Sequence, residues 1–463
     1  SALTSSIVSA QSSIVSNTDV DVSAAQSALT SSIVSAQSSI VSNTDDVQTV
    51  VDALQSEFIT ISEFSALVSA SAATASSYLI NDSDENISSY LNSNSTVHEK
   101  IKQFTAYNGD KLHLTATELN RLNTANDNNL SGGRLFAGDI DLQDTLDNLA
   151  SLSAATLASA SSYRLTDATG NAGEVVSTHA NITVAKADVH LGATNKTDYL
   201  YSLNDTAALL AAQDVDSVAA VGSAQSVTVN GTASIAQLTN ITSSKSSGAT
   251  LTYTSITDTA SNLVDDGGTF VTGDKNIIFL DEQNLSQLKT INGRTTGSIT
   301  FTEAGRSVAL SDTVSEVKSA LDGTFTNSYK GTVTLSDQAF ASTSTTVNAS
   351  DLSTIGSKTS GAVTVTNAIK IVGSHDQLKD ALVTTSSKVT ASSAIASFND
   401  AQNTEITAKE LSDIGSVVAS ATVTSAVKVS GNHDQLTAAF VTTTSKVTAS
   451  SAKVTFSDTK NTE

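Results

Sequence analysis

The chain has 463 residues and a formal net charge of −22, from 24 lysines and arginines against 46 aspartates and glutamates. This balance disfavours nucleic acid and anionic membrane as partners, because both require a basic surface. Proline, cysteine, methionine and tryptophan are all absent. The lack of cysteine excludes disulfides, thiolate catalysis and cysteine-ligated metals. A sulfur-free chain also resists oxidation, which suits a protein exported in many copies.

Two copies of one segment begin the chain. Ser1–Asp19 returns without change as Ser27–Asp45, and a series of positions from Leu29 to Leu54, apolar except for Asn43, alternates at spacings of four and three residues. This alternation is typical of the a/d seam of a coiled coil. We therefore predict heptad-like helical repeats over residues 1–58.

Residues 59–224 are rich in alanine and serine. Leu142, Leu146 and Leu149 mark an amphipathic stretch in this region, and their spacing favours a helix. Helix-opening signals of the form Thr-x-x-Glu also occur at Thr60 and Thr115. We expect a mainly helical region.

Near residue 225 the sequence changes to alternating threonine and valine, which predicts half-buried strands. The expected strands lie at residues 249–257, 298–302, 362–372, 421–429 and 452–456. Between them, a capping residue precedes an acid or amide by three positions, so that each side chain satisfies a free backbone N–H at a helix start. These helix starts are expected at Thr313, Asn348, Ser374, Thr407 and Asn432.

The clearest repeat lies in this C-terminal half. Gly373–Ser393 returns 58 positions later as Gly431–Ser451, with 16 of 21 residues unchanged. Periods of this size indicate arrays of small modules, and the interrupted copies lead us to expect a piece of a longer repetitive protein. The predicted modules are residues 225–283, 284–349, 350–408 and 409–463, the last of them cut short. The expected fold class is an α+β repeat protein, in which a helical Ser/Ala-rich N-terminal half precedes tandem modules of short capped helices and Thr/Val-rich strands.

The segment Val347–Gly361, with Lys388–Ser393 after it, resembles the tandem repeats of very large extracellular proteins of marine cyanobacteria. The resemblance rests on a Leu-x-x-Ile-Gly turn at Leu352–Gly356 and on the phrase Lys-Val-Thr-Ala-Ser that opens the second segment. It covers roughly residues 225–463. The resemblance implies a surface-layer, sheath or matrix role without catalytic residues.

The sequence contains no motif of a zinc protease, a phosphate-binding loop, a dinucleotide fold or an EF-hand, and we assign no catalytic or cofactor-binding residue. Carboxylates gather at two places, and their hard oxygen ligands suit calcium. The candidate ligands are Asp82, Asp84, Glu85, Asp139, Asp141 and Asp144. The competing interpretation is a solvated loop and a helix N-terminus, where the macrodipole favours acids. His375 and His433, each at an expected helix start and followed by aspartate, allow either a metal ligand or an exposed first-turn residue.

Together these features predict a non-catalytic, secreted structural protein that assembles with copies of itself into an extracellular filament, sheath or surface layer. Its expected partners are further copies and cell-surface polysaccharide, with no cofactor apart from calcium. The alternative is an adhesin or phage tail-fibre stalk that presents a binding tip, because Thr115–Asn120 is similar to a phrase common in tail fibres.

Overall fold

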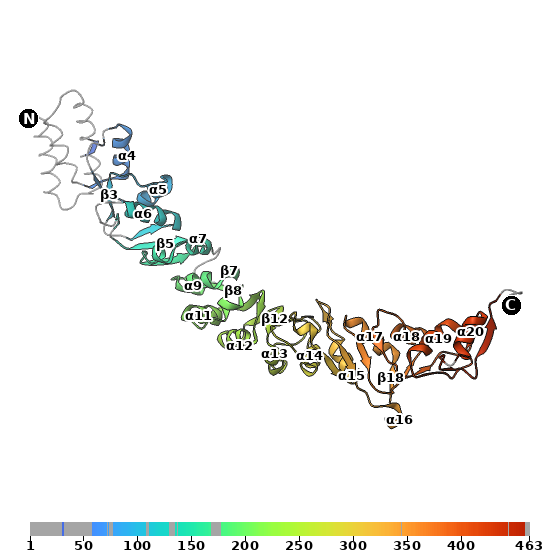
Figure 1. Cartoon of the computed structure of the whole chain (residues 1–463). Coiled ribbons are helices and arrows are strands. Elements are labelled where there is room, and N and C mark those ends of the chain that lie inside the picture. The colour runs from blue at the N-terminus through green and yellow to red at the C-terminus, as the bar shows by residue number, and fades with distance from the viewer. Residues whose placement is uncertain are drawn as a thin grey trace, which may run out of the picture. The chain divides into compact units, whose positions relative to one another are not determined.

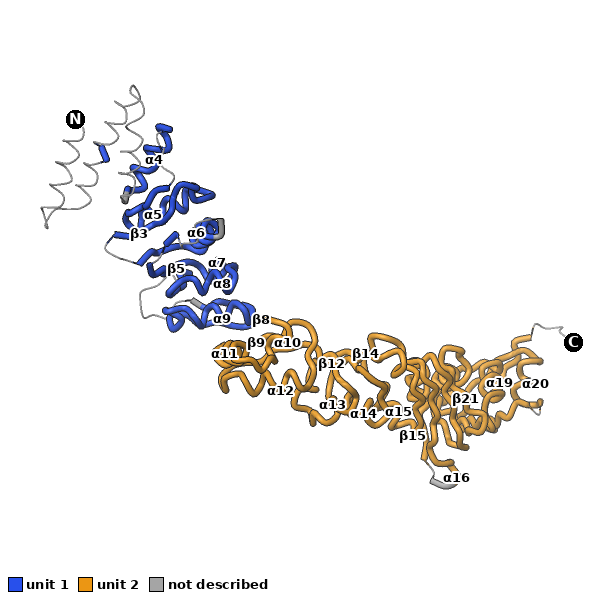
Figure 2. The backbone as a smooth tube through the Cα atoms, turned by 60° about the vertical axis from the view of Figure 1, so that its left-hand side comes forward, with its two compact units in different colours: residues 1–203 blue, residues 204–463 orange. Residues whose placement is uncertain are grey.

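The chain divides into two compact units, residues 1–203 and 204–463 (Figure 2). The computed structural model describes residues 30–31, 58–71, 73, 77–107, 111–128, 135–136, 138–167, 177–343, 345–442 and 444–458. The heptad repeats predicted for residues 1–58 therefore lie outside the described residues, apart from helical Thr30 and Ser31 and the terminal Phe58. Among the helices that are described, none has the length and apolar composition that a membrane crossing needs.

In unit 1, short strands alternate with short helices (Figure 1). The strands are β1 (Phe58–Ile59), β2 (Tyr78–Asp82), β3 (Ile101–Ala106), β4 (Leu112–Leu114), β5 (Ile140–Asp144), β6 (Ser162–Leu165), β7 (Ser177–Ile182) and β8 (Tyr199–Thr206), the last of which runs past the unit boundary. The helices are α4 (Ile61–Ser69), α5 (Asp84–Ser93), α6 (Ala116–Asn128), α7 (Leu146–Ala150), α8 (Ala154–Leu157), α9 (Val184–Gly192) and the 3-10 turn η2 (Lys196–Asp198). Pairing links β1-β2-β3, β4-β5-β6 and β7-β8.

Unit 2 continues the alternation with more strands. They are β9 (Ser226–Asn230), β10 (Thr232–Ala233), β11 (Thr250–Thr252), β12 (Ser255–Asp258), β13 (Asn276–Phe279), β14 (Ser298–Thr300), β15 (Leu310–Asp312), β16 (Thr324–Phe325), β17 (Val333–Leu335), β18 (Thr346–Asn348), β19 (Val363–Val365), β20 (Lys370–Gly373), β21 (Val389–Thr390), β22 (Ile395–Phe398), β23 (Glu405–Thr407), β24 (Ser420–Val423), β25 (Lys428–Gly431), β26 (Val447–Thr448) and β27 (Lys453–Phe456). The helices are α10 (Ala207–Leu210), α11 (Val215–Ser223), α12 (Ile235–Ser244), α13 (Ala260–Asp265), α14 (Leu285–Asn292), η3 (Gly305–Ser307), α15 (Val314–Leu321), α16 (Phe340–Thr343), α17 (Ala349–Lys358), α18 (His375–Leu382), α19 (Ala408–Val417) and α20 (His433–Phe440). The sheets include β10-β12-β13-β14-β16, β15-β17-β19-β21, β18-β20-β22-β24-β26 and β23-β25-β27, and β9 pairs with β11.

Within each sheet, the paired strands are parallel and lie 21 to 30 residues apart along the chain. The shortest separation is that of Ser255 and its partner Asn276, and the longest is that of Val333 and its partner Val363. Parallel neighbours cannot be joined by a tight hairpin and need a crossover, which short helices supply in most steps. Alternate strand residues enter the core, as the buried Ile277 and Phe279 of β13 do. The result in each unit is a mixture of helices and parallel sheets.

The predicted helix starts of the C-terminal half are confirmed. Reciprocal capping hydrogen bonds form at Ser374, Thr407 and Asn432. Thr313 accepts only from the backbone N–H of the third helical residue, and Asn348 is an N-cap without a side-chain capping bond. The local capping pattern therefore located these helices to within a residue, as expected from its chemistry.

The prediction of a mainly helical region over residues 59–224 is wrong, because strands β2 to β8 lie within it among the helices. Their sequences, such as Tyr-Leu-Ile-Asn-Asp in β2, contain few of the β-branched residues that mark strands in the C-terminal half. Each strand has only a few residues, so apolar alternation such as that of Tyr78 and Ile80 is too brief to stand out.

The turn predicted at Leu352–Gly356 is also wrong, because this segment belongs to helix α17. A Cβ placed on Gly356 would collide with the backbone carbonyl of Ser387, and one on Gly415 of α19 would collide with that of Ser445. Both glycines therefore allow a helix to lie directly against a neighbouring backbone. This close approach explains why glycine, a poor helix former, occurs inside these helices.

We predict that Gly415→Ala destabilises the protein, although alanine is the better helix former by about 1 kcal/mol. The methyl group must displace the Ser445 carbonyl, and overpacking of this kind costs about 1–3 kcal/mol. Urea denaturation followed by circular dichroism measures the change. Gly248→Ala is the matched control, since no atom lies within 4 Å of a Cβ there. A Gly415→Ala protein as stable as wild type would contradict this explanation.

Candidate functional site

Aspartate carboxylates hold the starts of helices throughout the described chain. In each case the N–H of the first helical residue donates to an aspartate that lies 21 to 28 residues further along. The aspartates, called the aspartate ladder below, are Asp82, Asp144, Asp167, Asp258, Asp281, Asp337, Asp400 and Asp458. They join α4, α6, α7, α12, α13, α15, α18 and α20 to the chain segment that follows.

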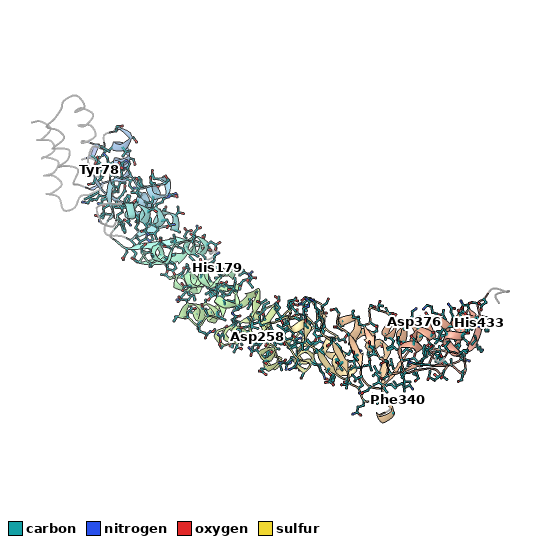
Figure 3. All side chains as sticks on the ribbon, in the orientation of Figure 1. Tyr78, His179, Asp258, Phe340, Asp376 and His433 are labelled. Atoms are coloured by element: carbon teal, nitrogen blue, oxygen red, sulfur yellow. The ribbon has the colours of Figure 1, made fainter. Side chains whose placement is uncertain are left out.

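Asp258 shows the fullest form of the contact (labelled in Figure 3). Its Oδ2 accepts from the N–H of Ile235, at the start of α12, at 2.9 Å. Its Oδ1 accepts from the Thr259 N–H at 2.8 Å and from Asn262 Nδ2 at 2.7 Å, at the start of α13. The residue is 6% exposed. One carboxylate therefore serves two consecutive helices, and Asp82 and Asp144 repeat this pattern with their own helices.

The position of these carboxylates has a simple electrostatic basis. The first N–H groups of a helix have no partner within it, and the macrodipole concentrates positive partial charge there. A buried carboxylate is costly unless its oxygens are bonded. Each partner therefore satisfies the other, and bonds to an ionised acceptor contribute about 1.5–3 kcal/mol each.

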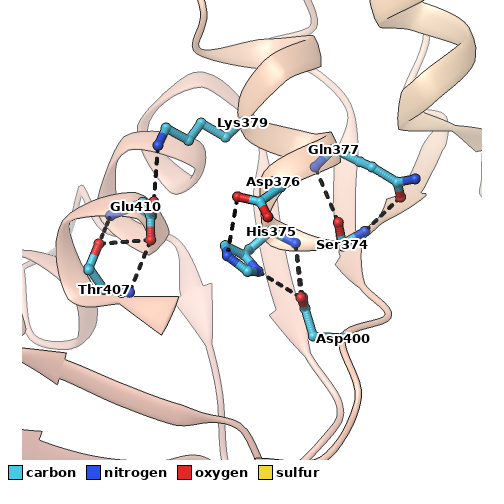
Figure 4. A network of polar contacts seen from close by, with 8 residues as sticks. All are labelled: Ser374, His375, Asp376, Gln377, Lys379, Asp400, Thr407 and Glu410. Carbon is cyan, nitrogen blue, oxygen red and sulfur yellow. Dashed lines mark hydrogen bonds and ion pairs between the residues drawn. The ribbon is translucent and has the colours of Figure 1, made fainter. Parts of the chain in front are cut away.

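At α18 the ladder includes a histidine (Figure 4). The backbone N–H of His375 lies 2.9 Å from Asp400 Oδ2, and its Nδ1 lies 2.7 Å from Oδ1. A carboxylate only accepts, so Nδ1 carries a proton. Nε2 lies 3.3 Å from Asp376, which is an acceptor and not a hydroxyl group that the ring could activate. The arrangement anchors a helix, and the interpretation of His375 as exposed is wrong, because its side chain is 13% exposed. His433 is exposed, and its N–H donates to Asp458.

The third residue of many helices bonds to a neighbouring helix. Glu410 of α19 accepts from Lys379 of α18 at 3.0 Å, and Asp351 of α17 accepts from Lys318 of α15 at 2.7 Å. The same position forms the contacts Glu118–Ser88, Lys186–Asp147, Gln287–Ser261 and Glu316–Lys289. Burial alone would raise the pKa of Glu410, but bonds from Thr407 and Lys379 outweigh it and lower that pKa below its ordinary value.

The calcium candidates take part in these contacts. Asp82 and Asp144 are ladder residues, and their oxygens accept from backbone N–H groups. Asp84 and Asp141 lie on either side of His113, at 2.6 Å from Nδ1 and 3.8 Å from Nε2. The structure therefore brings one carboxylate of each predicted cluster to the same imidazole.

Of the other two candidates, Asp139 accepts from the Ser161 hydroxyl and Glu85 is exposed. Among the residues that the structure describes, no group of three or more histidine, aspartate or glutamate side chains has the geometry of a metal site. Calcium binding by these residues stays a prediction.

A second titratable cluster lies in unit 1, where β7, α9 and β8 contribute His179, His190, Tyr199 and Tyr201 (His179 is labelled in Figure 3). The His179 ring stacks on Tyr199 at 4.9 Å, and His190 contacts Tyr201 edge to face at 4.9 Å. His190 is 2% exposed, and neither of its ring nitrogens has a hydrogen-bond partner within the described structure. Burial first, and then the nearby His179 and Lys196, lower the pKa of His190 to about 4.

Sequence reasoning missed both clusters, but only the ladder had a signal. Each ladder aspartate follows, by two positions, an apolar strand residue, and it either ends that strand or lies just after it. These residues are Ile80, Leu142, Leu165, Ile256, Phe279, Leu335, Phe398 and Phe456. A search for apolar-x-Asp at strand ends would have found the ladder, whereas nothing in the spacing of His179 and His190 indicates that they meet.

An open hollow of about 650 Å³ lies between α12 and α13, with Phe270 in its lining. Several of its polar groups are bonded within the chain. Thr239 donates to the Ile235 carbonyl, and Asn262 donates to Asp258. These groups hold the helices in place.

Comparisons with protein-family models, with curated proteins and with solved structures found no match for this chain. Its function is therefore inferred from its own residues.

We predict that Asp258→Asn destabilises the protein by about 2–3 kcal/mol. The amide retains the volume of the carboxylate, but it removes the charge at two helix starts and turns an NH₂ group toward backbone donors. Urea denaturation measures the loss. Asp265→Asn, at an exposed position of α13, is the control and should change stability by less than about 0.5 kcal/mol. If both variants lowered the free energy of unfolding equally, the ladder contact would contribute no more stability than an exposed aspartate does.

A second prediction concerns pH. The pKa of His190 is about 4, against 6.5 for the free group, so the folded protein favours the neutral form of the imidazole ring. Its contribution to stability is complete above pH 6.5 and is lost as the pH falls toward 4, by roughly 3 kcal/mol in all. In calorimetry, the drop in Tm from pH 7 to pH 4.5 should be smaller for His190→Phe than for wild type.

The exposed His433→Gln is the control, and it should retain the wild-type drop in Tm. If His190→Phe also retained the full drop, the acid sensitivity would have to come from other groups.

Proposed function

We propose that this chain is a non-catalytic structural protein whose copies assemble into an extracellular filament, sheath or surface layer. The observation that carries the proposal is the aspartate ladder. Its carboxylates recur in both units, and each one joins the start of a helix to the segment that follows. Acidic side chains, which an enzyme would place around a substrate, serve here to join short helices and strands within each unit.

The strand pattern supports the same proposal. Within each sheet, a strand pairs in parallel with one that lies 21 to 30 residues further along the chain, so segments can be added without changing the sheet geometry. In repeat proteins each unit contacts only its neighbours, and length increases by addition. We propose that the 58-residue sequence repeat is one such module and that the C-terminal half is built of four of them.

Composition supports a location outside the cell. The chain has no cysteine or methionine, so thiol and thioether oxidation cannot damage it. Its net charge of −22 keeps separate copies soluble, and assembly must therefore use surfaces where acids are few. Copies of the chain and cell-surface polysaccharide are the proposed partners.

The proposal predicts that the purified chain associates as its concentration rises. Analytical ultracentrifugation should show a concentration-dependent increase in mass, and negative-stain microscopy should show a filament or sheet whose contacts each bury more than about 800 Å². A chain that stays monomeric at all concentrations would contradict the proposal. An isolated trimer would favour the adhesin or tail-fibre stalk. A parallel series with EDTA tests calcium, since an unchanged assembly after chelation would remove calcium from the proposal.

A further inference from the structure

The hollow between α12 and α13 separates two consecutive helices of unit 2. Other consecutive helices of this unit meet directly, as α14 and α15 do with the ion pair of Lys289 and Glu316 between them. On the α12 side the room comes from small side chains, because Ala236, Thr239 and Ser243 recur at spacings of three and four residues and share one helix face. The volume of about 650 Å³ falls in the range of ligand sites, ~300–1,000 Å³.

Phe270 is held in a fixed position beside this hollow. Its backbone N–H donates to the Asp266 carboxylate at 2.9 Å, and its carbonyl accepts from the Tyr253 hydroxyl at 3.0 Å. The turn that brings Phe270 back to Asp266 contains Gly267 and Gly268, whose φ values of +68° and +89° suit glycine. The Phe270 ring is half-buried. A partly exposed ring that is already ordered loses little conformational entropy when a ligand stacks on it.

The free polar groups of the hollow suit a ligand rich in hydroxyl groups. Thr239 and Asn262 are bonded within the chain, but the side chains of Asp265 and Thr242 are exposed and have no hydrogen-bond partner among the described residues. The carboxylate accepts, whereas the hydroxyl both donates and accepts. The carboxylates of Asp265 and Asp266 and the net charge of −22 disfavour an anionic ligand. A neutral sugar meets all these conditions.

We propose that this hollow binds a neutral polysaccharide, with one sugar ring stacked on Phe270 and its hydroxyl groups bonded to Asp265 and Thr242. A β-linked glucan has the fitting chemistry, because its equatorial hydroxyl groups leave two apolar C–H faces on each ring. Since the hollow is open, the glycan can continue beyond the bound sugar. This inference rests on the proposed function and assigns residues to the contact with cell-surface polysaccharide.

The test measures binding of cellohexaose to the full chain by isothermal titration calorimetry. Wild type should bind, and Phe270→Ala and Asp265→Ala should each weaken binding at least tenfold. Phe340→Ala is the matched control, because this phenylalanine is also half-buried but belongs to α16 (labelled in Figure 3), and it should leave the affinity unchanged. Asp265 is exposed, so Asp265→Ala should keep the wild-type thermal unfolding curve and its lost affinity would not come from misfolding.

Wild-type affinity in both Phe270→Ala and Asp265→Ala would overturn the inference. A wild type that does not bind cellohexaose, or that binds trilysine more tightly, would overturn it as well, since the second result would identify a cationic ligand. Ultracentrifugation of the same proteins separates this result from the proposed assembly. A wild type that binds cellohexaose but stays monomeric at all concentrations would support the saccharide site and overturn the polymer.

Discussion

The bond between an aspartate carboxylate and the first N–H of a helix is the contact on which the architecture depends. The helices are short, and helices of this length have little stability alone in water. Eight of the described helices are positioned at the N-terminus, where a capping residue satisfies one N–H and the ladder aspartate satisfies another, as at α12. Since that aspartate lies within two residues of the end of a later strand, the same bond fixes the helix start relative to that strand. Asp258 extends this to the following helix through Asn262, so neighbouring steps depend on each other.

Two sites show that the helix start can also be positioned by shape. At the end of β20 and of β25, the residue before the cap is Gly373 or Gly431, whereas five other described helices have aspartate at this position, as α13 does with Asp258. A Cβ on either glycine would lie 2.8 Å from the Cβ of Ala349 or Ala408, which begin α17 and α19. Here the strand end and the helix start are in direct contact, with no room for a carboxylate between them. A carboxylate at those five helices and close backbone contact at these two connect the end of a strand to the start of an earlier or following helix.

The sequence predicted what local chemistry determines and missed what depends on distant partners. The caps at Ser374 and Thr407 were found because both partners lie within three residues. Asp82 and Asp144 are calcium candidates because carboxylate oxygens suit this ion, and no local pattern indicates that they accept from a helix start 21 or 28 residues earlier. The parallel sense of the strands was missed for the same reason, since it depends on a crossover and not on the strand's own residues.

Electrostatic repulsion opposes any contact between copies of this chain. A protein with a net charge of −22 repels its own copies, and this repulsion acts over about 8 Å at physiological salt. Within unit 2, lysines such as Lys318 and Lys379 form ion pairs with acids of a neighbouring helix, so these basic groups offset acids of their own chain.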